Sequence, residues 1–336
     1  MRFVPNRGRR LLLAAVAAAV TLSACSTTGT EGNDAAAPAA SGSAGAAFPA
    51  TVTTAFGDIT ITKQPERVVT LGWSDAEVAL ALGVQPVGDS DWLAFGGDGQ
   101  GPWNQGKYTT PPTMVGTLEP DMEKIASLKP DLILDTRASG EKDRYDKLAA
   151  LGVPVVGIPA GATAYTTTWD QQLDLVGKAL GKSTEAAKLK TDLEAQYASV
   201  AAANPTFKDK TVSAGVKSSQ GWGAYVSGDG RIDFLQKLGF KNADKVEALK
   251  KDNFFIPLSQ EQVGLLDADL TTIFMIGVKT DEVKNDKLLQ NVPSVKAGHV
   301  VYLDDPAISN AFSSNSVLGI RYALDKVPPL LSAALG

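Results

Sequence analysis

"PDMEKIASLKPDLIL" (120–134) and "LSQEQVGLLDADLTTIF" (258–274) repeat one pattern, in which a helix-like segment runs directly into a short β-rich segment. Glu123 of the first copy aligns with Glu261 of the second. The positions that follow also match: Ile125 with Val263, Leu128 with Leu266, Asp131 with Asp269, and Leu132 with Leu270. A pattern written twice predicts two similar lobes, each with a carboxylate at the equivalent place.

The sequence around the first copy alternates short β-rich runs with helical ones. The β-rich runs are "RVVTL", "QPVGD", "MVG", "DLILD" and "PVVGI", and Ser74 is placed to cap the helical run "DAEVALAL". Another stretch, "VTTAFGDITIT" (52–62), alternates around Gly57 and is typical of a β-hairpin. Strands that alternate with helices indicate parallel α/β units, so we expect an N-terminal α/β lobe over residues 51–165.

Residues 166–203 have a different, helical pattern, with Ser183 as a candidate N-cap. Four apolar or aromatic residues recur there at helical spacing: Leu189, Leu193, Tyr197 and Val200. About 20 helical residues span roughly 30 Å, which is the width of a small domain. The α/β pattern then restarts over 204–336. The expected fold class is therefore α/β, with two lobes built on central, mostly parallel sheets and a long helical segment between them.

The first residues predict export and a lipid anchor. A basic start precedes the apolar run 11–20, which is too short to span a bilayer and has the length of a signal-peptide core. The leader ends in "LSAC" (22–25), the pattern of a bacterial lipobox. We expect 1–24 to be a lipoprotein signal peptide and Cys25 to be lipidated. A chance cysteine in a cleaved leader is the alternative.

The segment after Cys25 has almost nothing to bury. In residues 26–50, 21 of 25 are Ala, Gly, Ser, Thr or Pro. Such a chain is flexible and spans on the order of 27 Å, so we expect 25–50 to tether a folded part to a membrane surface. That folded part, 51–336, is long enough for two domains.

Composition argues against several classes of function. Once Cys25 carries the anchor, the folded part has no thiol, and His299 is its one histidine. A zinc, manganese or iron–sulfur site and a Ser-His-Asp triad therefore have little support. Removing the four arginines of the leader takes the formal net charge from −5 to −9 (−5 − 4), which argues against nucleic acid as a partner. Neither a catalytic set nor a metal site of the protein's own stands out, so we do not expect an enzyme, although composition alone leaves that class open.

Aromatic residues gather in the predicted connections. "LGWSD", "SDWLAFGGDGQGPW" and "GWGAYVSGDG" are rich in Gly, Ser or Asp and hold four of the five tryptophans. Ligands of open α/β sheets bind at the turns that follow the strands, and a cation follows the strand "LILD". The predicted ligand-binding residues are Trp73, Trp92, Trp103, Arg137, Trp222, Tyr225, Arg231 and Phe255. The alternative for each is structural, as a plug over the core of its own lobe or as a surface cation.

Five segments, taken in order, carry a family resemblance: "ITKQPERVVTLGWSDAEVALALGVQPVGDSDW" (61–92), "VGTLEPDMEKIASLKPDLIL" (115–134), "YDKLAALGVPVVGIP" (145–159), "FIPLSQEQVGLLDADL" (255–270) and "VPSVKAGHVVYL" (292–303). The chain resembles the class III substrate-binding proteins of bacterial ABC importers, the family that delivers ferric siderophores, haem and cobalamin. The resemblance covers essentially all of 50–336. It implies that a long, rigid interlobe helix joins the lobes and that they close only modestly.

The resemblance also implies a role for the repeated carboxylate. The family places one surface glutamate on each lobe to meet arginines of the permease, and the matching positions here are Glu123 and Glu261. Such a pseudo-twofold pair suits a permease dimer, because each of its subunits offers an equivalent basic pocket. Without the resemblance, two acids favoured by the helix dipole at a helix start would explain the pattern equally well.

Among the ligands of this family a ferric siderophore fits best, because of the aromatic connections and Arg137. The resemblance then implies a monomeric extracytoplasmic lipoprotein of the cell membrane that binds iron only through its chelator and passes it to an ABC permease. Haem and cobalamin are the alternative ligands, and an anchored enzyme or adhesion module on the same scaffold is the alternative class. A catecholate complex carries about three negative charges and would need several cations around it. Three cations are available here, Lys107, Arg137 and Arg231, against many aromatic residues. This balance slightly favours a near-neutral hydroxamate or a mixed chelate as the ligand.

Overall fold

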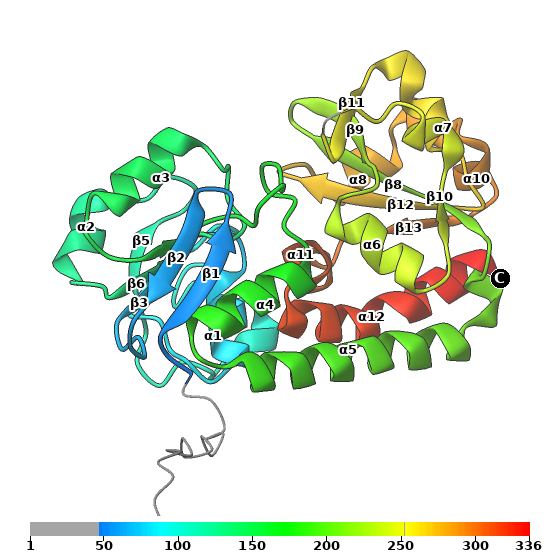
Figure 1. Cartoon of the computed structure of the whole chain (residues 1–336). Helices are drawn as coiled ribbons and strands as arrows, with labels where there is room; N and C mark the ends of the chain where they lie inside the picture. The colour runs from blue at the N-terminus through cyan, green and yellow to red at the C-terminus, as the bar shows by residue number, and fades with distance from the viewer. Residues whose placement is uncertain (1–46, 252) are drawn as a thin grey trace, which may run out of the picture. The chain divides into compact units, whose positions relative to one another are not determined.

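The computed structural model describes residues 47–251 and 253–336, which form two lobes that each contain a sheet (Figure 1). The predicted signal peptide, Cys25 and most of the predicted tether lie outside the described residues. Within them, no helix combines the length and the apolar character that a membrane crossing requires.

The first lobe is built on a five-stranded sheet in which all neighbouring strands are parallel. In spatial order the strands are β5 (Thr113–Gly116), β4 (Gly88–Ser90), β3 (Val68–Thr70), β6 (Leu132–Leu134) and β7 (Val155–Val156). The other elements are α1 (Asp75–Ala81), η1 (Pro102–Asn104), α2 (Met122–Ser127) and α3 (Lys142–Ala149). Val69 and Ile133 belong to one apolar cluster and Val68 and Leu132 to another, as the two-residue period of a strand requires. Both faces of the sheet are thus buried, the usual setting of a parallel sheet.

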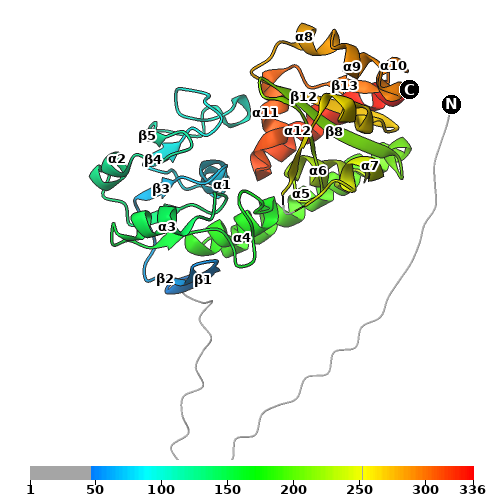
Figure 2. The same cartoon turned by 90° about the horizontal axis from the view of Figure 1, so that it is seen from above.

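The predicted hairpin is confirmed. Strand β1 (Ala50–Thr54) pairs antiparallel with β2 (Gly57–Ile61), and Gly57 adopts a φ of +104°, which favours glycine. The hairpin lies against α4 (Trp169–Ala179), and its buried Val52 belongs to the same apolar cluster as Leu173 of α4 (Figure 2).

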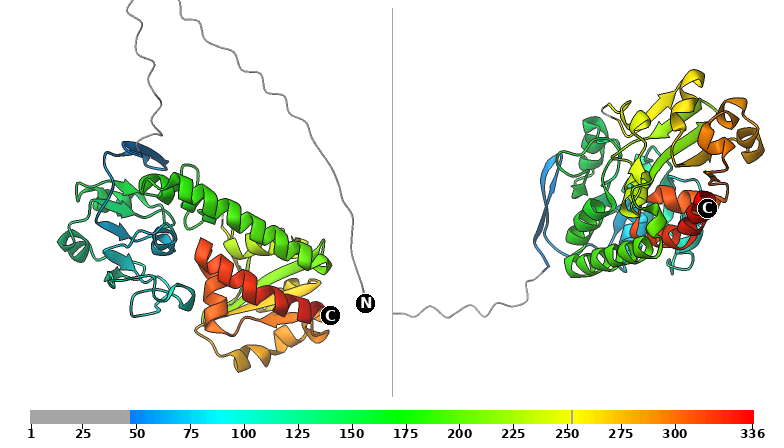
Figure 3. Two further views of the ribbon diagram at one scale, coloured as in Figure 1. Left: turned by 90° about the horizontal axis from the view of Figure 1, so that it is seen from below. Right: turned by 90° about the vertical axis from the view of Figure 1, so that its right-hand side faces the viewer.

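Two helices, α4 and the 21-residue α5 (Ser183–Ala203), occupy the region for which the sequence predicts helix. The predicted apolar face of α5 is confirmed, with Leu193 and Tyr197 buried and Leu189 and Val200 packed against the same cluster. Helix α5 lies beside α12 (Val317–Leu335) along the base of the structure (Figures 1 and 3). The prediction that Ser183 is an N-cap is wrong, since a turn at Gly181 (φ +67°) puts Lys182 in that position.

The second lobe is built on a mixed six-stranded sheet. Its strands are β8 (Thr211–Ser218), β9 (Gly221–Tyr225), β10 (Lys241–Asn242), β11 (Phe255–Leu258), β12 (Leu270–Ile276) and β13 (Val300–Tyr302). Strand β8 is parallel to β10 and β12, and β12 to β13, whereas β9 runs antiparallel to both β8 and β11. The remaining elements are η2 (Pro205–Phe207), α6 (Gly230–Lys237), α7 (Asp244–Glu247), η3 (Gln260–Leu266), α8 (Thr280–Lys284), α9 (Lys287–Gln290), α10 (Pro293–Lys296) and α11 (Pro306–Ser314).

In both copies of the repeated pattern, the shared aspartate ties together the starts of two parallel strands. Asp131, just before β6, accepts hydrogen bonds from the backbone N of Glu66 (2.9 Å) and of Arg67 (2.8 Å), where the chain enters β3. Asp269, just before β12, accepts bonds from the N (2.8 Å) and the Oγ1 (2.9 Å) of Thr211, the first residue of β8. The repeat therefore has a structural role in each sheet.

The helical parts of the two copies differ. The first copy forms the α-helix α2, whereas the second forms the 3₁₀ helix η3. Gly264 of η3 stands where α2 has Ala126, and a glycine inside an α-helix costs roughly 1 kcal/mol relative to alanine. The tighter helix still buries Val263, as α2 buries Ile125.

Candidate ligand-binding site

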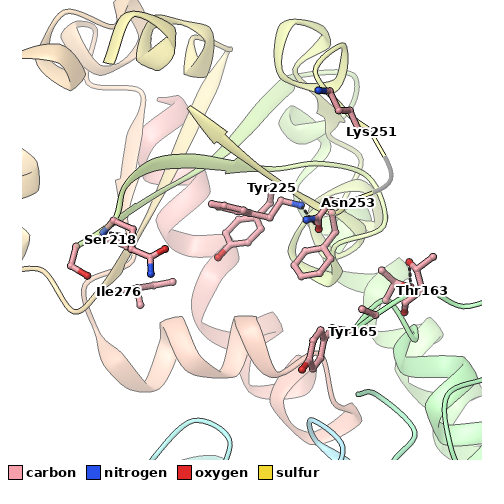
Figure 4. A pocket seen from close by; sticks show the side chains of 13 residues that line it. Thr163, Tyr165, Ser218, Tyr225, Lys251, Asn253 and Ile276 are labelled. Atoms are coloured by element: carbon pink, nitrogen blue, oxygen red, sulfur yellow. Dashed lines mark hydrogen bonds between the residues drawn. The ribbon is translucent and has the colours of Figure 1, made fainter. Parts of the chain in front are cut away.

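A cavity of about 920 Å³ opens at the carboxyl ends of β8 and β12 (Figure 4). Residues 163–166, which lie between β7 and α4, line one part of it. The other lining residues belong to the second lobe and include the β8–β9 turn (218–220) and the entry to β11 (253–255). The ends of parallel strands are where open α/β sheets bind ligands, so this cavity is the candidate site.

A second cavity, of about 420 Å³, adjoins the first. The two share five lining residues: Thr163, Thr166, Lys251, Asn253 and Phe254. The second cavity is bounded further by polar or small residues such as Thr168 and Ser227, and by one more cation, Lys250. A ligand in the larger cavity can therefore extend into this second, polar cavity, which we call the annex.

Two of the predicted ligand-binding residues, Tyr225 and Phe255, line the larger cavity, with their ring centroids 5.8 Å apart. Tyr165, on the segment before α4, is a further aromatic residue of the lining. The predicted Trp73 and Trp92 do not line this cavity but lie behind Tyr165, since Trp73 stacks on Tyr165 (4.3 Å between centroids) and on Trp92 (4.6 Å). The two tryptophans therefore support the wall of the cavity through the stack on Tyr165.

Arg137 follows β6 as predicted, but its side chain is buried, with a fractional exposure of 4%. Its Nη1 donates a hydrogen bond to the carbonyl of Ser314 (2.8 Å) and its Nε one to the carbonyl of Tyr165 (3.3 Å). Burial lowers the pKa of Arg137 to about 10, against the attraction of Asp229. Arg137 thus fixes the backbone of a cavity residue and does not itself line the cavity.

Arg231 lies behind the opposite wall. Its Nη1 pairs with the carboxylate of Asp229 (2.9 Å), and its guanidinium carbon lies 4.1 Å from the ring centroid of Tyr225. Burial, the largest single influence, lowers the pKa of Arg231, but the charge of Asp229, the neighbouring Tyr225 and the hydrogen bond to Asp229 together outweigh it and raise that pKa. The charge of Arg231 is therefore already compensated within the protein.

The turn between α11 and α12 is docked on buried polar groups of the first lobe. Ser316, the N-cap of α12, donates a hydrogen bond to Glu77, which also accepts one from the indole of Trp103 (2.8 Å). Burial raises the pKa of Glu77, and these two hydrogen bonds oppose the shift. The predicted ligand residue Trp103 is thus engaged in this contact and is not a lining residue. Ser74 is the N-cap residue of α1, as predicted, but its side chain makes no capping hydrogen bond, since its hydroxyl donates to the carbonyl of Ser314 (2.6 Å).

Asp75, also on α1, lies in the same polar layer. Its carboxylate accepts hydrogen bonds from the backbone N of Gly72 (3.0 Å) and of Thr136 (3.0 Å), from the Thr136 hydroxyl, and from Nε2 of Gln172 (2.7 Å). Burial raises the pKa of Asp75 to about 6, although these hydrogen bonds favour the ionised form. This carboxylate joins α1, the segment after β6, and α4.

Trp222 was predicted to lie in a connection, but it lies in β9, so that prediction is wrong. It shares an apolar cluster with Ala224, whereas Tyr225 faces the other side of the sheet. Its indole donates to Asp286 (3.1 Å), and the ammonium of Lys217 lies 5.1 Å from its ring centroid. The structure therefore places Trp222 away from the cavity, in the packing of its own lobe.

Several lining residues were not predicted, among them Tyr165, Gln220, Phe254 and Ile276. A signal existed for two of them. Tyr165 belongs to "PAGATAYTTT", which follows the predicted strand "PVVGI", and Phe254 belongs to "DNFF", an aromatic pair in a polar connection. Gln220 and Ile276 gave no comparable signal.

Glu123 and Glu261 are both exposed, in the first turns of α2 and η3. Within residues 47–251 and 253–336, neither carboxylate has a hydrogen-bond or ion-pair partner. Both side chains are therefore open to solvent at equivalent places of the repeated pattern.

The chain belongs to the periplasmic binding protein family, whose family model matches residues 68–307. The match covers the five-stranded and the six-stranded sheet and every segment that lines the larger cavity. The family predicted from the sequence is thereby confirmed.

Known relatives and structures agree with this assignment. The chain is 30% identical over 296 residues to the probable siderophore-binding lipoprotein YfiY of Bacillus subtilis, which covers 80% of this chain and 82% of the relative. It is 29% identical over 251 residues to the Fe(3+)-citrate-binding protein YfmC of the same organism, with coverages of 74% and 76%. Its structure is similar to that of Streptococcus pneumoniae PiaA in complex with ferrichrome, with a TM-score of 0.73, 27% identity, and coverages of 85% and 98%.

Asp233 makes the stability of the second lobe depend on pH. It lies on α6, and burial, followed by the negative charge of Asp229, raises the pKa of Asp233 from 3.8 to about 6. The folded protein then binds this proton more tightly than the unfolded chain does. The contribution is present at low pH, so the free energy of unfolding falls as pH rises from about 4 to about 6.

Replacing Asp233 by Asn should raise the free energy of unfolding by about 1–2 kcal/mol near neutral pH, because a charge that burial disfavours is removed. The gain should vanish as pH falls towards about 4, where the native carboxyl is protonated. Urea unfolding at several pH values measures both effects. Asp281→Asn, at an exposed position of α8, is the matched control and should show no such pH-dependent gain. A gain of the same size at every pH would contradict the prediction.

Proposed function

We propose that this protein captures a ferric siderophore in the 920 Å³ cavity and delivers it to an ABC permease. The observation that carries the proposal is a large cavity walled by Tyr165, Tyr225 and Phe255 in a member of the periplasmic binding protein family. Its volume lies near the upper end of the usual range for ligand sites, about 300–1,000 Å³. The name of the B. subtilis relative and the ferrichrome complex of PiaA support the same ligand class.

The character of the lining supports binding of an intact chelate. Aromatic faces and neutral amide and hydroxyl groups make up most of it, which suits a ligand whose iron is already coordinated. The family is one of binding proteins, and we infer that capture and release without chemical change is the activity.

The exposed pair Glu123 and Glu261 is the proposed docking contact with the permease. Each glutamate follows the start of its helix and precedes a strand that begins directly after the shared aspartate, so the two lobes present equivalent carboxylates. A permease of two subunits can offer an equivalent arginine to each of them. In the free protein each carboxylate is hydrated, and it gains a charged partner only in the complex.

A lipid on Cys25 is the proposed anchor. The "LSAC" sequence and the small-residue segment after it support this, as does the word lipoprotein in the name of a relative. The binding lobes would then work at the extracytoplasmic face of the cell membrane, as a monomer, within reach of the permease.

Truncating an aromatic side chain of the wall should weaken binding. Phe255→Ala or Tyr165→Ala should each raise the Kd of the bound ferric siderophore about 5- to 150-fold, because about 1–3 kcal/mol of aromatic contact is lost. Quenching of tryptophan fluorescence, first with a panel of ferric siderophores, haem and cobalamin, measures this. Tyr302→Ala, on β13 and outside the cavity, is the control and should leave the Kd within about 2-fold. Wild-type affinity in both wall variants would move the site elsewhere.

Removing both docking carboxylates should abolish uptake but not binding. Glu123→Ala with Glu261→Ala should keep the Kd for the ligand and change the free energy of unfolding by less than about 0.5 kcal/mol, since both side chains are solvated. Each permease arginine that is left without its partner at the buried interface should weaken the binding free energy of the complex with the permease by about 2–5 kcal/mol. Cellular uptake of the iron-55 chelate measures delivery. Glu141→Ala with Glu282→Ala, two other exposed acids, is the matched control. Normal uptake in the docking variant, or loss of ligand binding, would refute the docking role.

The lipid should be found on Cys25 and nowhere else. Mass spectrometry of the protein extracted from membranes should show a diacylglyceryl group on an N-terminal Cys25, and Cys25→Ser should leave the protein unanchored. Thr28→Ser, in the neighbouring tether, should stay anchored. An unmodified mature terminus in native membranes would rule the anchor out.

A further inference from the structure

We propose that the ligand is a ferric chelate close to electrical neutrality, of the trishydroxamate class, and not a polyanionic catecholate or carboxylate chelate. This inference rests on the proposed function and narrows it. The distribution of charge around the 920 Å³ cavity carries it.

Among the described residues, the lining of this cavity has a single charged side chain, Lys251. Tyr165 and Tyr225 present aromatic rings, and Gln220 and Asn253 present amides. Lys251 is exposed, and Figure 4 shows it at the rim, apart from the two tyrosine rings. A ligand between the aromatic walls therefore meets neutral groups.

The other cations near the cavity are already engaged. Arg231 forms an ion pair with Asp229 (2.9 Å). Arg137 is buried and donates hydrogen bonds to two backbone carbonyls. In the adjoining cavity, the ammonium of Lys250 lies 3.9 Å from Glu247. The arginines thus stiffen the walls without adding free positive charge to the space that the ligand occupies.

A trianionic chelate would lose much of its hydration in such a cavity and gain little in return. Burying charge is costly unless cations converge on it, and one exposed lysine gives a weak, salt-screened attraction. A neutral chelate loses little hydration and gains contact with the aromatic faces. Its amide-rich backbone can accept and donate hydrogen bonds at Gln220, Asn253 and the threonines of the annex.

Titration of the full-length folded protein with three coloured probes tests the inference. Ferrichrome is the neutral trishydroxamate. The trianion is the iron(III) complex of a synthetic tripod with three dihydroxybenzamide arms. Ferric citrate is the anionic carboxylate chelate. Ferrichrome should bind at least about 10-fold more tightly than either anion. Its Kd should change less than about 2-fold between about 0.05 and 0.5 M sodium chloride. Equal or tighter binding of either anion overturns the inference but not the proposed function, whereas failure of all three to bind overturns the proposed function.

Charge variants separate electrostatics from shape. Ser219→Lys with Ile276→Lys adds two cations to the lining at positions to which no hydrogen bond with the ligand is assigned, since Ile276 is 55% exposed and Ser219 is exposed. The double variant should improve the affinity for the trianion at least about 10-fold more than it improves the affinity for ferrichrome. Lys251→Gln should keep the Kd of ferrichrome within about 3-fold of the wild-type value, because an exposed lysine contributes little. Thermal unfolding verifies that each variant is folded. If the added lysines do not help the trianion, or Lys251→Gln abolishes ferrichrome binding, the inference is wrong.

Discussion

The cavity depends on one contact, in which the turn between α11 and α12 is docked on buried polar groups of the first lobe. The carbonyl of Ser314 accepts hydrogen bonds from Ser74 and Arg137, and the hydroxyl of Ser316 donates one to Glu77. A buried polar group without a partner costs about 1–3 kcal/mol, so the turn can dock well in few other positions. Because these bonds join segments far apart in the chain, they hold the second lobe against the first.

The two walls of the cavity follow one scheme. On each wall a tyrosine ring faces the cavity and an arginine supports it from behind: Arg137 binds the carbonyl of Tyr165, and Arg231 lies over the ring of Tyr225. Trp73 and Trp92 extend the support behind Tyr165 as a stack. Aromatic groups fixed in this way lose little conformational entropy when a ligand binds, which favours affinity.

Sequence patterns predicted the sheets well and the site only in part. Short β-rich runs identified the strands of the first lobe, a two-residue alternation identified its hairpin, and helical spacing identified the apolar face of α5, because these patterns report burial directly. Composition, in contrast, placed Trp222 in a connection at the site, where the structure does not bring it. Its neighbours resemble a loop in composition, yet pairing with β8 and β11 makes them a strand and turns Trp222 to the opposite face from Tyr225.

The sequence by itself determined the family, the two α/β lobes, the leader pattern and the equivalence of Glu123 and Glu261. Each of these features is recognised from residues that lie close together in the sequence. Only the tertiary structure decided which aromatics face the cavity and that its nearby arginines are already engaged. Those outcomes depend on partners distant in sequence, such as Ser314 for Arg137, and no local pattern encodes them. A cavity is bounded by segments that meet only after folding, and so its charge is a property of the fold.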